Sequence, residues 1–341
     1  MATRYPVGKL PHSVMRRLLE AHVGGTSEDV LVGPAIGEDA AALQLDHLCL
    51  VAASDPITFA TEAIGYYAVH VNANDVATMG ARPRWFLATL LIPPVATDGE
   101  IEKIFVDIAS ACGQIGAAWC GGHTEICTDL PRPLVVGTML GTVEEGRLLC
   151  TADAAAGDLL FCTKRVPLEA TALIARERRE WALRQLGKAA WQRCSELLYR
   201  PGISVVAEAV AAAAAGDALH DPTEGGIATG LHELADAASV GLEIDFAAIP
   251  FDPDGALLCT AASIDPLGAL ASGALLIAAP PEQAECVSLA VADAGVECQL
   301  IGRLVEKRAG RILRRGRERR ELPAFAVDEV ARLFGSANQG R

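Results

Sequence analysis

Short apolar segments alternate with alanine-rich segments in the second half of the chain, and this alternation restricts the fold more than any other feature. The segments GDLLFC, DALH, GLEIDF, GALLIAA and CQLIGRL are short and apolar, as buried strands are, whereas VVAEAVAAAAAG is typical of a helix. Strands that alternate with helices build a sheet covered by helices. We therefore predict an α/β domain over residues 155–341.

The first half of the chain, residues 1–150, predicts a separate domain of mixed strands and amphipathic helices. A chain of 341 residues is longer than one hydrophobic core usually serves, so two domains of about 150 residues are expected. In residues 99–116 apolar side chains recur at helical spacing, whereas LCLVAAS and PLVVGTMLGTV are typical of buried strands. This half therefore combines amphipathic helices with a sheet.

Composition excludes several classes of protein. Apolar residues make up 51% of the chain and charged residues 21%, which is typical of a globular protein. No apolar run reaches the ~20 residues of a membrane span, and MATRYPVGKLPHSVMRR lacks a hydrophobic signal segment, so we expect a soluble, cytoplasmic protein with no membrane partner. The net charge of −14 argues against nucleic acid as a partner, and we interpret the basic segment Arg314–Arg320 as a solvated hairpin or loop.

Cysteine and histidine spacing argues against a zinc site. The ten cysteines are scattered and include no Cys-x-x-Cys pair, so most are interpreted as buried, reduced thiols. His232-Glu233 begins a His-Glu-x-x-His pattern, but residue 236 is Asp, which argues against a zinc protease.

Two aspartates occupy positions where a carboxylate needs an explanation. Asp75 lies in EAIGYYAVHVNANDVATMG, which predicts a helix, and it continues the inward stripe of Ile64, Ala68 and Val71. Asp55 directly follows the strand LCLVAAS. Burying a carboxylate is costly unless it is paired or bound to a metal. Turn formation at Asp55, or pairing of Asp75 with a nearby arginine, is the ordinary alternative.

Two further aspartates have similar surroundings. Asp39 lies beside Glu38 in IGEDAAAL, and Asp221 lies in HDPTEGG just before a predicted helix, where helix capping is the ordinary alternative. Carboxylates with open coordination positions suit Mg²⁺, which fills its remaining positions with water and phosphate. The four aspartates together therefore predict a magnesium site.

Three segments offer donors for a phosphate group. CGGHTE, residues 120–125, has two glycines whose backbone amides can approach an anion closely. TEGG, residues 223–226, opens a predicted helix, and Lys9 in PVGKLP adds a mobile positive charge. His123 and His220 lie beside these segments and either contact substrate or make structural hydrogen bonds. The two commonest nucleotide-binding motifs, the P-loop and Gly-x-Gly-x-x-Gly, are absent from the sequence.

The segments GKLP, GPAIGEDAAAL, SDPIT, VHVNANDVATMGARPRW, GGHTE and HDPTEGGIATGLHELA together resemble the aminoimidazole ribonucleotide (AIR) synthetase-like, or PurM-like, superfamily. Its members include the purine cyclo-ligase, selenophosphate synthetase, thiamine-monophosphate kinase and the hydrogenase maturation protein HypE, and the chain looks most like HypE-like, AIR synthase-related proteins. The resemblance implies an N-terminal α+β domain that forms a β-barrel with a second subunit, a C-terminal α/β domain, and ATP bound between them.

The resemblance also implies roles for individual residues. Asp39 and Asp75, with Lys9, are the candidate catalytic residues, and Glu38 is a solvated neighbour of Asp39. The candidate magnesium ligands are Asp39, Asp55, Asp75 and Asp221. The candidate ATP-binding residues are Lys9, Gly121, Gly122, His123, Thr124, Thr223, Gly225 and Gly226.

The sequence departs from the characterised members at three places. HypE carries its substrate on a C-terminal cysteine, but this sequence ends in GSANQGR and its last cysteine is Cys298. Selenophosphate synthetases have a reactive Cys or selenocysteine where this chain has Pro6 and Val7. The purine enzyme has Glu where this chain has His123.

The predicted function is Mg²⁺-dependent ATP binding with phosphoryl transfer to an external small-molecule or protein-borne acceptor, in a homodimer. Cyclo-ligase-like or selenophosphate synthetase-like chemistry is one alternative. A non-catalytic nucleotide-binding scaffold in a maturation pathway is another.

Overall fold

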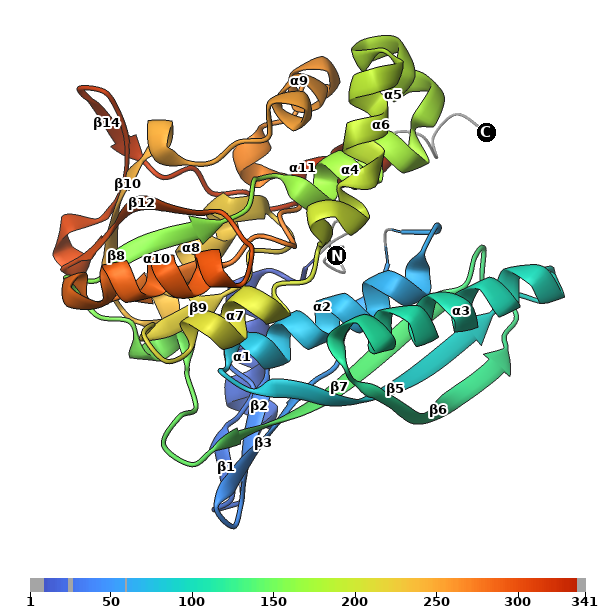
Figure 1. Cartoon of the computed structure of the whole chain (residues 1–341), viewed down its shortest axis with the longest axis horizontal. Helices are drawn as coiled ribbons and strands as arrows, with labels where there is room; N and C mark the ends of the chain where they lie inside the picture. The colour runs from blue at the N-terminus through green and yellow to red at the C-terminus, as the bar shows by residue number, and fades with distance from the viewer. Residues whose placement is uncertain (1–8, 24–26, 59, 336–341) are drawn as a thin grey trace. The chain divides into compact units, whose positions relative to one another are not determined.

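The computed structural model describes residues 9–23, 27–58 and 60–335, and the chain divides into two compact units (Figure 1). Unit 1 comprises residues 1–26, 34–38 and 149–341, and unit 2 comprises residues 27–33 and 39–148. The predicted first domain, residues 1–150, included the N-terminal segment. In the structure this segment belongs to unit 1, because Lys9 and His12 form ion pairs with Glu233 of the C-terminal half.

Unit 2 is a seven-stranded sheet with helices packed on it. The strand order is β1-β2-β3-β7-β5-β6, with β4 also paired to β7, and all pairs are antiparallel except β5 with β6. This mixture of strands and helices is the predicted α+β arrangement. The strands are β1 (Val30–Val32), β2 (Ala41–Leu45), β3 (Leu48–Ala53), β4 (Pro56–Ile57), β5 (Arg82–Ile92), β6 (Ala118–Ile126) and β7 (Leu134–Glu144).

The helices of unit 2 are α2 (Ile64–Thr78) and α3 (Asp98–Ile115), which pack against each other. Helix α3 confirms the helix predicted over residues 99–116 and begins with a capping box between Thr97 and Glu100. Helix α2 confirms the helix predicted around Asp75, but it does not have the single inward stripe that was predicted. Every residue of α2 is buried except Val71, because the helix lies between the sheet and α3. Gly65 allows the close approach, since a Cβ there would lie 2.6 Å from the Ile104 carbonyl oxygen.

Unit 1 contains a second seven-stranded sheet, in the order β14-β13-β10-β12-β8-β11-β9. The five predicted strands of the second half are confirmed as β8, β9, β10, β11 and β12. The basic segment, predicted as a hairpin or a loop, forms the β13–β14 hairpin. The strands are β8 (Leu159–Thr163), β9 (Ala218–His220), β10 (Gly241–Asp245), β11 (Leu276–Ala279), β12 (Cys298–Val305), β13 (Arg311–Arg315) and β14 (Glu318–Glu321).

The core of unit 1 joins this sheet to α8, the helix that matters most for the site. Ile227, Leu231 and Leu234 of α8 pack with Leu160 and Leu276 of the sheet. The buried face of α8 therefore holds its N-terminus in a fixed position. The helices are α1 (His12–His22), α4 (Leu168–Glu177), α5 (Arg179–Leu186), α6 (Lys188–Glu196), α7 (Val206–Ala212), α8 (Gly226–Ala237), α9 (Pro253–Ala262), α10 (Ala284–Asp293) and α11 (Glu329–Gly335).

Two further properties bear on the sequence predictions. In the described part of the chain, no helix has the length and apolar character needed to cross a membrane. All ten cysteines are free thiols. Five are buried, two are exposed, and three are intermediate, so the prediction that most are buried holds for only half of them.

Candidate functional site

The N-terminus of α8 follows β9 through a turn that only glycine can complete. Gly225 and Gly226 have positive φ angles of +79° and +66°. A Cβ on Gly225 would lie 2.2 Å from Thr229 Oγ1, and one on Gly226 would lie 2.6 Å from the Leu267 carbonyl oxygen. Both glycines are therefore required by backbone conformation and by close packing.

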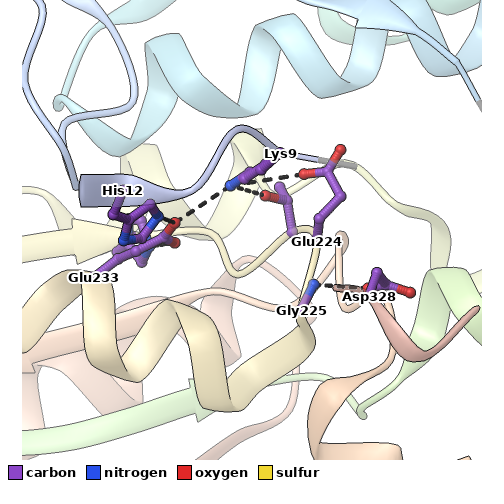
Figure 2. Close-up of polar contacts among 8 residues, drawn as sticks. Lys9, His12, Glu224, Gly225, Glu233 and Asp328 are labelled. Atoms are coloured by element: carbon purple, nitrogen blue, oxygen red, sulfur yellow. Dashed lines mark hydrogen bonds and ion pairs between the residues drawn. The ribbon is translucent and has the colours of Figure 1, made fainter. Parts of the chain in front are cut away.

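The amides of these glycines already have acceptors. The Gly225 amide donates to Asp328 Oδ2 at 2.7 Å (Figure 2). The Gly226 amide donates to the Thr223 carbonyl oxygen at 3.0 Å. Asp328 also accepts from the Val330 amide at 2.7 Å. A phosphate at this helix end would have to displace the Asp328 carboxylate from Gly225. The prediction of an open anion-binding helix end thus overlooked the C-terminal segment that returns to it.

Glu233, on the second turn of α8, is a buried carboxylate surrounded by basic side chains. Its oxygens lie 3.4 Å from Lys9 Nζ and 3.4 Å from His12 Nε2 (Figure 2). They also lie 3.2 Å from His220 Nε2, and the Glu233 side chain is only 7% exposed. Burial raises the pKa of Glu233, but hydrogen bonds from His12 and His220 and the Lys9 charge outweigh burial and hold the pKa well below its usual range. Glu233 is therefore an anion in the folded protein.

Lys9 lies at the start of α8, where the sequence predicted only a mobile charge. Its Nζ donates to Thr223 Oγ1 at 3.1 Å and lies 3.6 Å from Glu224 Oε2, in addition to its contact with Glu233. The Lys9 side chain is 43% exposed. Of the predicted ATP-binding residues, Lys9 and Thr223 are thus in direct contact, next to Gly225.

A second group of acids interacts with one another near the turn that precedes α8. The group consists of Glu169, Glu224, Asp328 and Glu329. Burial raises the pKa of Asp328 to about 6 despite the amide hydrogen bonds, and the neighbouring Glu224 and Glu329 charges raise it further. Burial also raises the pKa of Glu169, on α4, to about 7, with smaller contributions from Glu224 and Asp328. Carboxyl groups this close together resist simultaneous ionisation.

In unit 2, the backbone at Asp55 is held by a buried asparagine. The Asp55 amide donates to Asn72 Oδ1 at 2.8 Å, and Asn72 Nδ2 donates to the carbonyl oxygens of Ala68 and Asp55 at 2.9 and 3.3 Å. Gly137 makes room for the amide, since a Cβ there would lie 2.3 Å from Asn72 Nδ2. Asn72 thus fixes the chain where β3 ends and Asp55 begins the next segment.

The other predicted ligands of unit 2 lie on different elements. Asp39 is half-buried just before β2, and Asp75 is buried within α2. Glu38 belongs to unit 1, and the prediction that it is solvated holds only in part. It is half-buried and accepts hydrogen bonds from the Thr151 and Ala152 amides at 3.2 and 3.1 Å, at the start of a short 3₁₀ helix.

The chemical type of these residues fits Mg²⁺, a hard cation that prefers carboxylate oxygens. Across residues 9–23, 27–58 and 60–335, no group of three or more His, Cys, Asp or Glu side chains is placed to hold a metal ion. The structure therefore contains no all-protein metal cage in this part of the chain. One or two carboxylates combined with water and phosphate oxygens remain compatible with the donor set, because Mg²⁺ commonly binds in that way.

The segment predicted as a nucleotide loop is a strand instead. Gly121, Gly122, His123 and Thr124 lie in β6, which pairs in parallel with β5 and ends the sheet order. Gly122 has φ +140°, and a Cβ there would lie 1.9 Å from the Ala88 carbonyl oxygen. The sequence suggested a loop because of its two glycines, but here glycine permits close contact with the neighbouring strand.

A cavity of about 960 Å³ opens in unit 1 away from all of the predicted residues. A buried ion pair between Lys164 Nζ and Glu208 Oε1, 2.6 Å apart, lines it together with Arg165, Arg193 and Arg200. An acidic partner lies at 3.5 Å or less from each of three of these basic residues, Lys164, Arg165 and Arg193. The residues predicted from the sequence therefore do not occupy this cavity.

Sequence reasoning missed several residues of the α8 site. The sequence predictions did not include His12 or Asp328, included Glu224 only as part of the segment TEGG, and considered Glu233 only as part of an incomplete zinc motif. A local signal existed for Glu233 alone, because it follows Gly226 by seven residues and so lies on the same helix face two turns later. Its partners Lys9 and Asp328 are distant in the sequence and carry no local pattern.

The fold and these residues define a two-domain protein. Its α+β unit carries acids at the ends of strands, and its α/β unit places acidic side chains and a lysine beside the start of a helix. The chain belongs to the AIR synthase-related protein family. The model of the family's N-terminal domain matches residues 37–143, and the model of its C-terminal domain matches residues 155–314.

Two curated relatives show how far the similarity extends. A carbamoyl dehydratase HypE of Rhizobium leguminosarum bv. viciae is 30% identical over 259 residues, covering 73% of this chain and 70% of the relative. A putative hydrogenase expression/formation protein of Methanocaldococcus jannaschii is 24% identical over 315 residues, covering 90% and 91% of the two chains.

Three solved structures share the fold. HypE in a HypE–HypF complex superposes with a TM-score of 0.73 at 19% identity, covering 92% of this chain and 99% of that one. The hydrogenase maturation protein HypE in complex with ATP gives 0.67 at 20% identity, covering 91% and 94%. AaThiL complexed with AMPPCP and TMP gives 0.69 at 19% identity, covering 90% and 92%.

Proposed function

We propose that this protein binds ATP together with Mg²⁺ and transfers a phosphoryl group to an external small-molecule or protein-borne acceptor. One observation in this member of the family carries the proposal. The Lys9 ammonium lies beside the Thr223 hydroxyl, just before the start of α8. A lysine at a helix start offers positive charge to phosphate oxygens. The fold relatives described as bound to ATP or AMPPCP support ATP as the ligand.

Each group of residues has a distinct task in this proposal. Lys9 and the Thr223 hydroxyl bind and orient the phosphates, and Asp39, Asp55, Asp75 and Asp221 are the proposed Mg²⁺ ligands. When bound, the metal supplies charge neutralisation between phosphate oxygens. An acidic protein with a net charge of −14 needs such neutralisation to hold a polyanion.

Calorimetry with ATP and AMPPCP tests the metal and the acids together. With Mg²⁺ present we expect saturable binding, and with EDTA we expect its loss. Asp39→Asn and Asp75→Asn should each weaken binding by about tenfold or more. Asp98→Asn is the matched control, because Asp98 is in the first turn of α3 and is not a proposed ligand. Equal affinity with EDTA, or unchanged affinity in both variants, would refute the metal assignment.

Turnover separates an enzyme from a nucleotide-binding scaffold. We expect ADP formation from MgATP to accelerate when the correct acceptor is added, since phosphoryl transfer depends on positioning an acceptor oxygen close to the phosphoryl group. Hydrogenase maturation proteins with which this chain shares its fold suggest a carbamoyl-bearing or similar acceptor for the first trials. Nucleotide binding without turnover across acceptors would favour the scaffold.

We also propose a homodimer formed through unit 2. Among the described residues, the outer edge of β6 pairs with no other strand, and Ile126 at its end is 58% exposed. An open strand edge with exposed apolar side chains is a common place for a second copy to bind.

A further inference from the structure

Glu233 joins three segments of unit 1 at one buried carboxylate. Lys9 precedes α1, His12 begins α1, and His220 ends β9, and all three side chains reach Glu233 within 3.4 Å. The carboxylate belongs to α8, whose apolar face is part of the unit 1 core. A helix packed on the unit 1 core therefore holds the segment that bears Lys9.

The same turn of α8 also contacts the segment that leads to Asp39. Gly37 has φ +89°, and a Cβ there would lie 2.9 Å from the Glu233 carbonyl oxygen and 3.1 Å from Ala237 Cβ. Asp39 follows Gly37 by two residues. The backbone of Glu233 thus lies against Gly37 in the unit 1 segment 34–38, and its side chain contacts Lys9.

Lys9 is placed by its contacts rather than by burial. Its side chain is 43% exposed, so a free lysine at this position would sample many rotamers. Thr223 and Glu224 contact the ammonium from the turn before α8, and Glu233 contacts it from within the helix. Glu233 is the most buried of these partners, since its side chain is 7% exposed and that of Glu224 is 31% exposed.

We propose that Glu233 is a positioning residue that fixes the Lys9 ammonium at the start of α8, where it meets the phosphates of the nucleotide. This inference rests on the proposed function, in which Lys9 binds phosphate. Glu233 itself contacts neither nucleotide nor acceptor and acts through Lys9. Its loss leaves the charge on Lys9 intact but removes the most buried of the three contacts that hold the ammonium in place.

The kinetic test compares Glu233→Gln with Glu243→Gln. Glu243 is a matched control, because it lies in the same unit, is 11% exposed and also serves three basic side chains, Arg303, Arg314 and Arg319. We expect Glu233→Gln to lower kcat for phosphate release from MgATP by about 10- to 100-fold, with a smaller change in KM. Glu243→Gln should leave kcat within twofold. Equal losses in both variants would overturn the proposal.

A double-mutant cycle separates positioning from a structural role. Combining Glu233→Gln with Lys9→Met should lower kcat no further than Lys9→Met alone, because Glu233 acts through Lys9. Additive losses would show that Glu233 acts independently of Lys9 and would overturn the proposal. If Glu233→Gln does not fold, Glu233→Asp replaces it, since it keeps the charge and shortens the reach by one methylene.

Lysine NMR provides a readout that needs no turnover. The chain has only five lysines, so reductive ¹³C-methylation yields few signals, and Lys9→Arg assigns that of Lys9; the lysines are Lys9, Lys103, Lys164, Lys188 and Lys307. We expect the Lys9 signal to move in Glu233→Gln and not in Glu243→Gln. Its response to AMPPCP with Mg²⁺ should also weaken in Glu233→Gln.

The NMR outcomes distinguish the inference from the proposed function. If the Lys9 signal of the wild-type protein does not move when AMPPCP and Mg²⁺ are added, the role of Lys9 in phosphate binding is refuted. A Lys9 signal that responds to nucleotide equally in the wild-type protein and in Glu233→Gln refutes only the positioning role of Glu233.

Discussion

Replacing Asn72 by Ala should destabilise unit 2 by about 3 kcal/mol. The Asn72 side chain is 0% exposed and makes three hydrogen bonds, of 2.8, 2.9 and 3.3 Å, two of them to the backbone of Asp55. Each such bond contributes about 0.5–1.5 kcal/mol, and the Asp55 amide would lose its acceptor. The cavity left by the side chain adds to the loss.

The chain offers a clean optical assay for this prediction. Trp85 and Trp119 lie in unit 2, and Trp181 and Trp191 in unit 1, so fluorescence of a Trp181→Phe/Trp191→Phe background reports unit 2 alone during urea unfolding. Thr78→Val is the matched control on the same helix, because its hydroxyl makes a single hydrogen bond, to the Asp75 carbonyl oxygen. We expect less than about 1 kcal/mol for that control.

A second measurement connects this packing to the site. If Asn72 holds the backbone at Asp55 in place, Asn72→Ala should also weaken MgATP binding, even under conditions where unit 2 is folded. A change in the free energy of unfolding below about 1 kcal/mol would show that water replaces the asparagine and would refute the reasoning.

Three further predictions concern other parts of the molecule. Gly226→Ala should destabilise unit 1 by about 2 kcal/mol or more, because φ is +66° and the new Cβ would lie 2.6 Å from the Leu267 carbonyl oxygen. Urea unfolding followed by the fluorescence of Trp181 and Trp191 measures this loss of stability. An unchanged unfolding midpoint would contradict the prediction. Burial raises the folded-state pKa of Glu169 to about 7 and that of Asp328 to about 6, above their unfolded values. Their contribution to the stability of unit 1 is therefore fully present below about pH 4 and is lost as the pH rises towards 7. Thermal unfolding between pH 5 and pH 8 should show this loss, and Glu169→Gln should reduce it; an identical slope in that variant would exclude Glu169 as the cause. Light scattering at micromolar concentration should find a dimer that Ile126→Lys dissociates, and a monomeric wild-type protein would exclude the proposed dimer.

The sequence by itself determined the local elements of this protein. The helix predicted over residues 99–116, the helix around Asp75 and the strands of both halves are present, because side-chain periodicity and β-branched runs reflect burial of one face or of a whole strand. The family was also readable from short segments such as HDPTEGG. These signals are contained in stretches of ten to twenty residues, and the packing of each element agrees with them.

Only the tertiary structure decided which distant segments meet. Lys9 contacts Glu233 and Gly225 contacts Asp328 across more than one hundred residues, so no spacing in the sequence announces either pair. The two glycines of CGGHTE carry the same local pattern whether they line a loop or a strand, and the strand resulted because β5 lies beside them. Glu38 was assigned to solvent for the same reason, since its partners Thr151 and Ala152 become neighbours only when the chain returns from unit 2 to unit 1. Hydrogen bonds and ion pairs between distant residues depend on the path of the whole chain, and for that reason the site emerged only from the folded molecule.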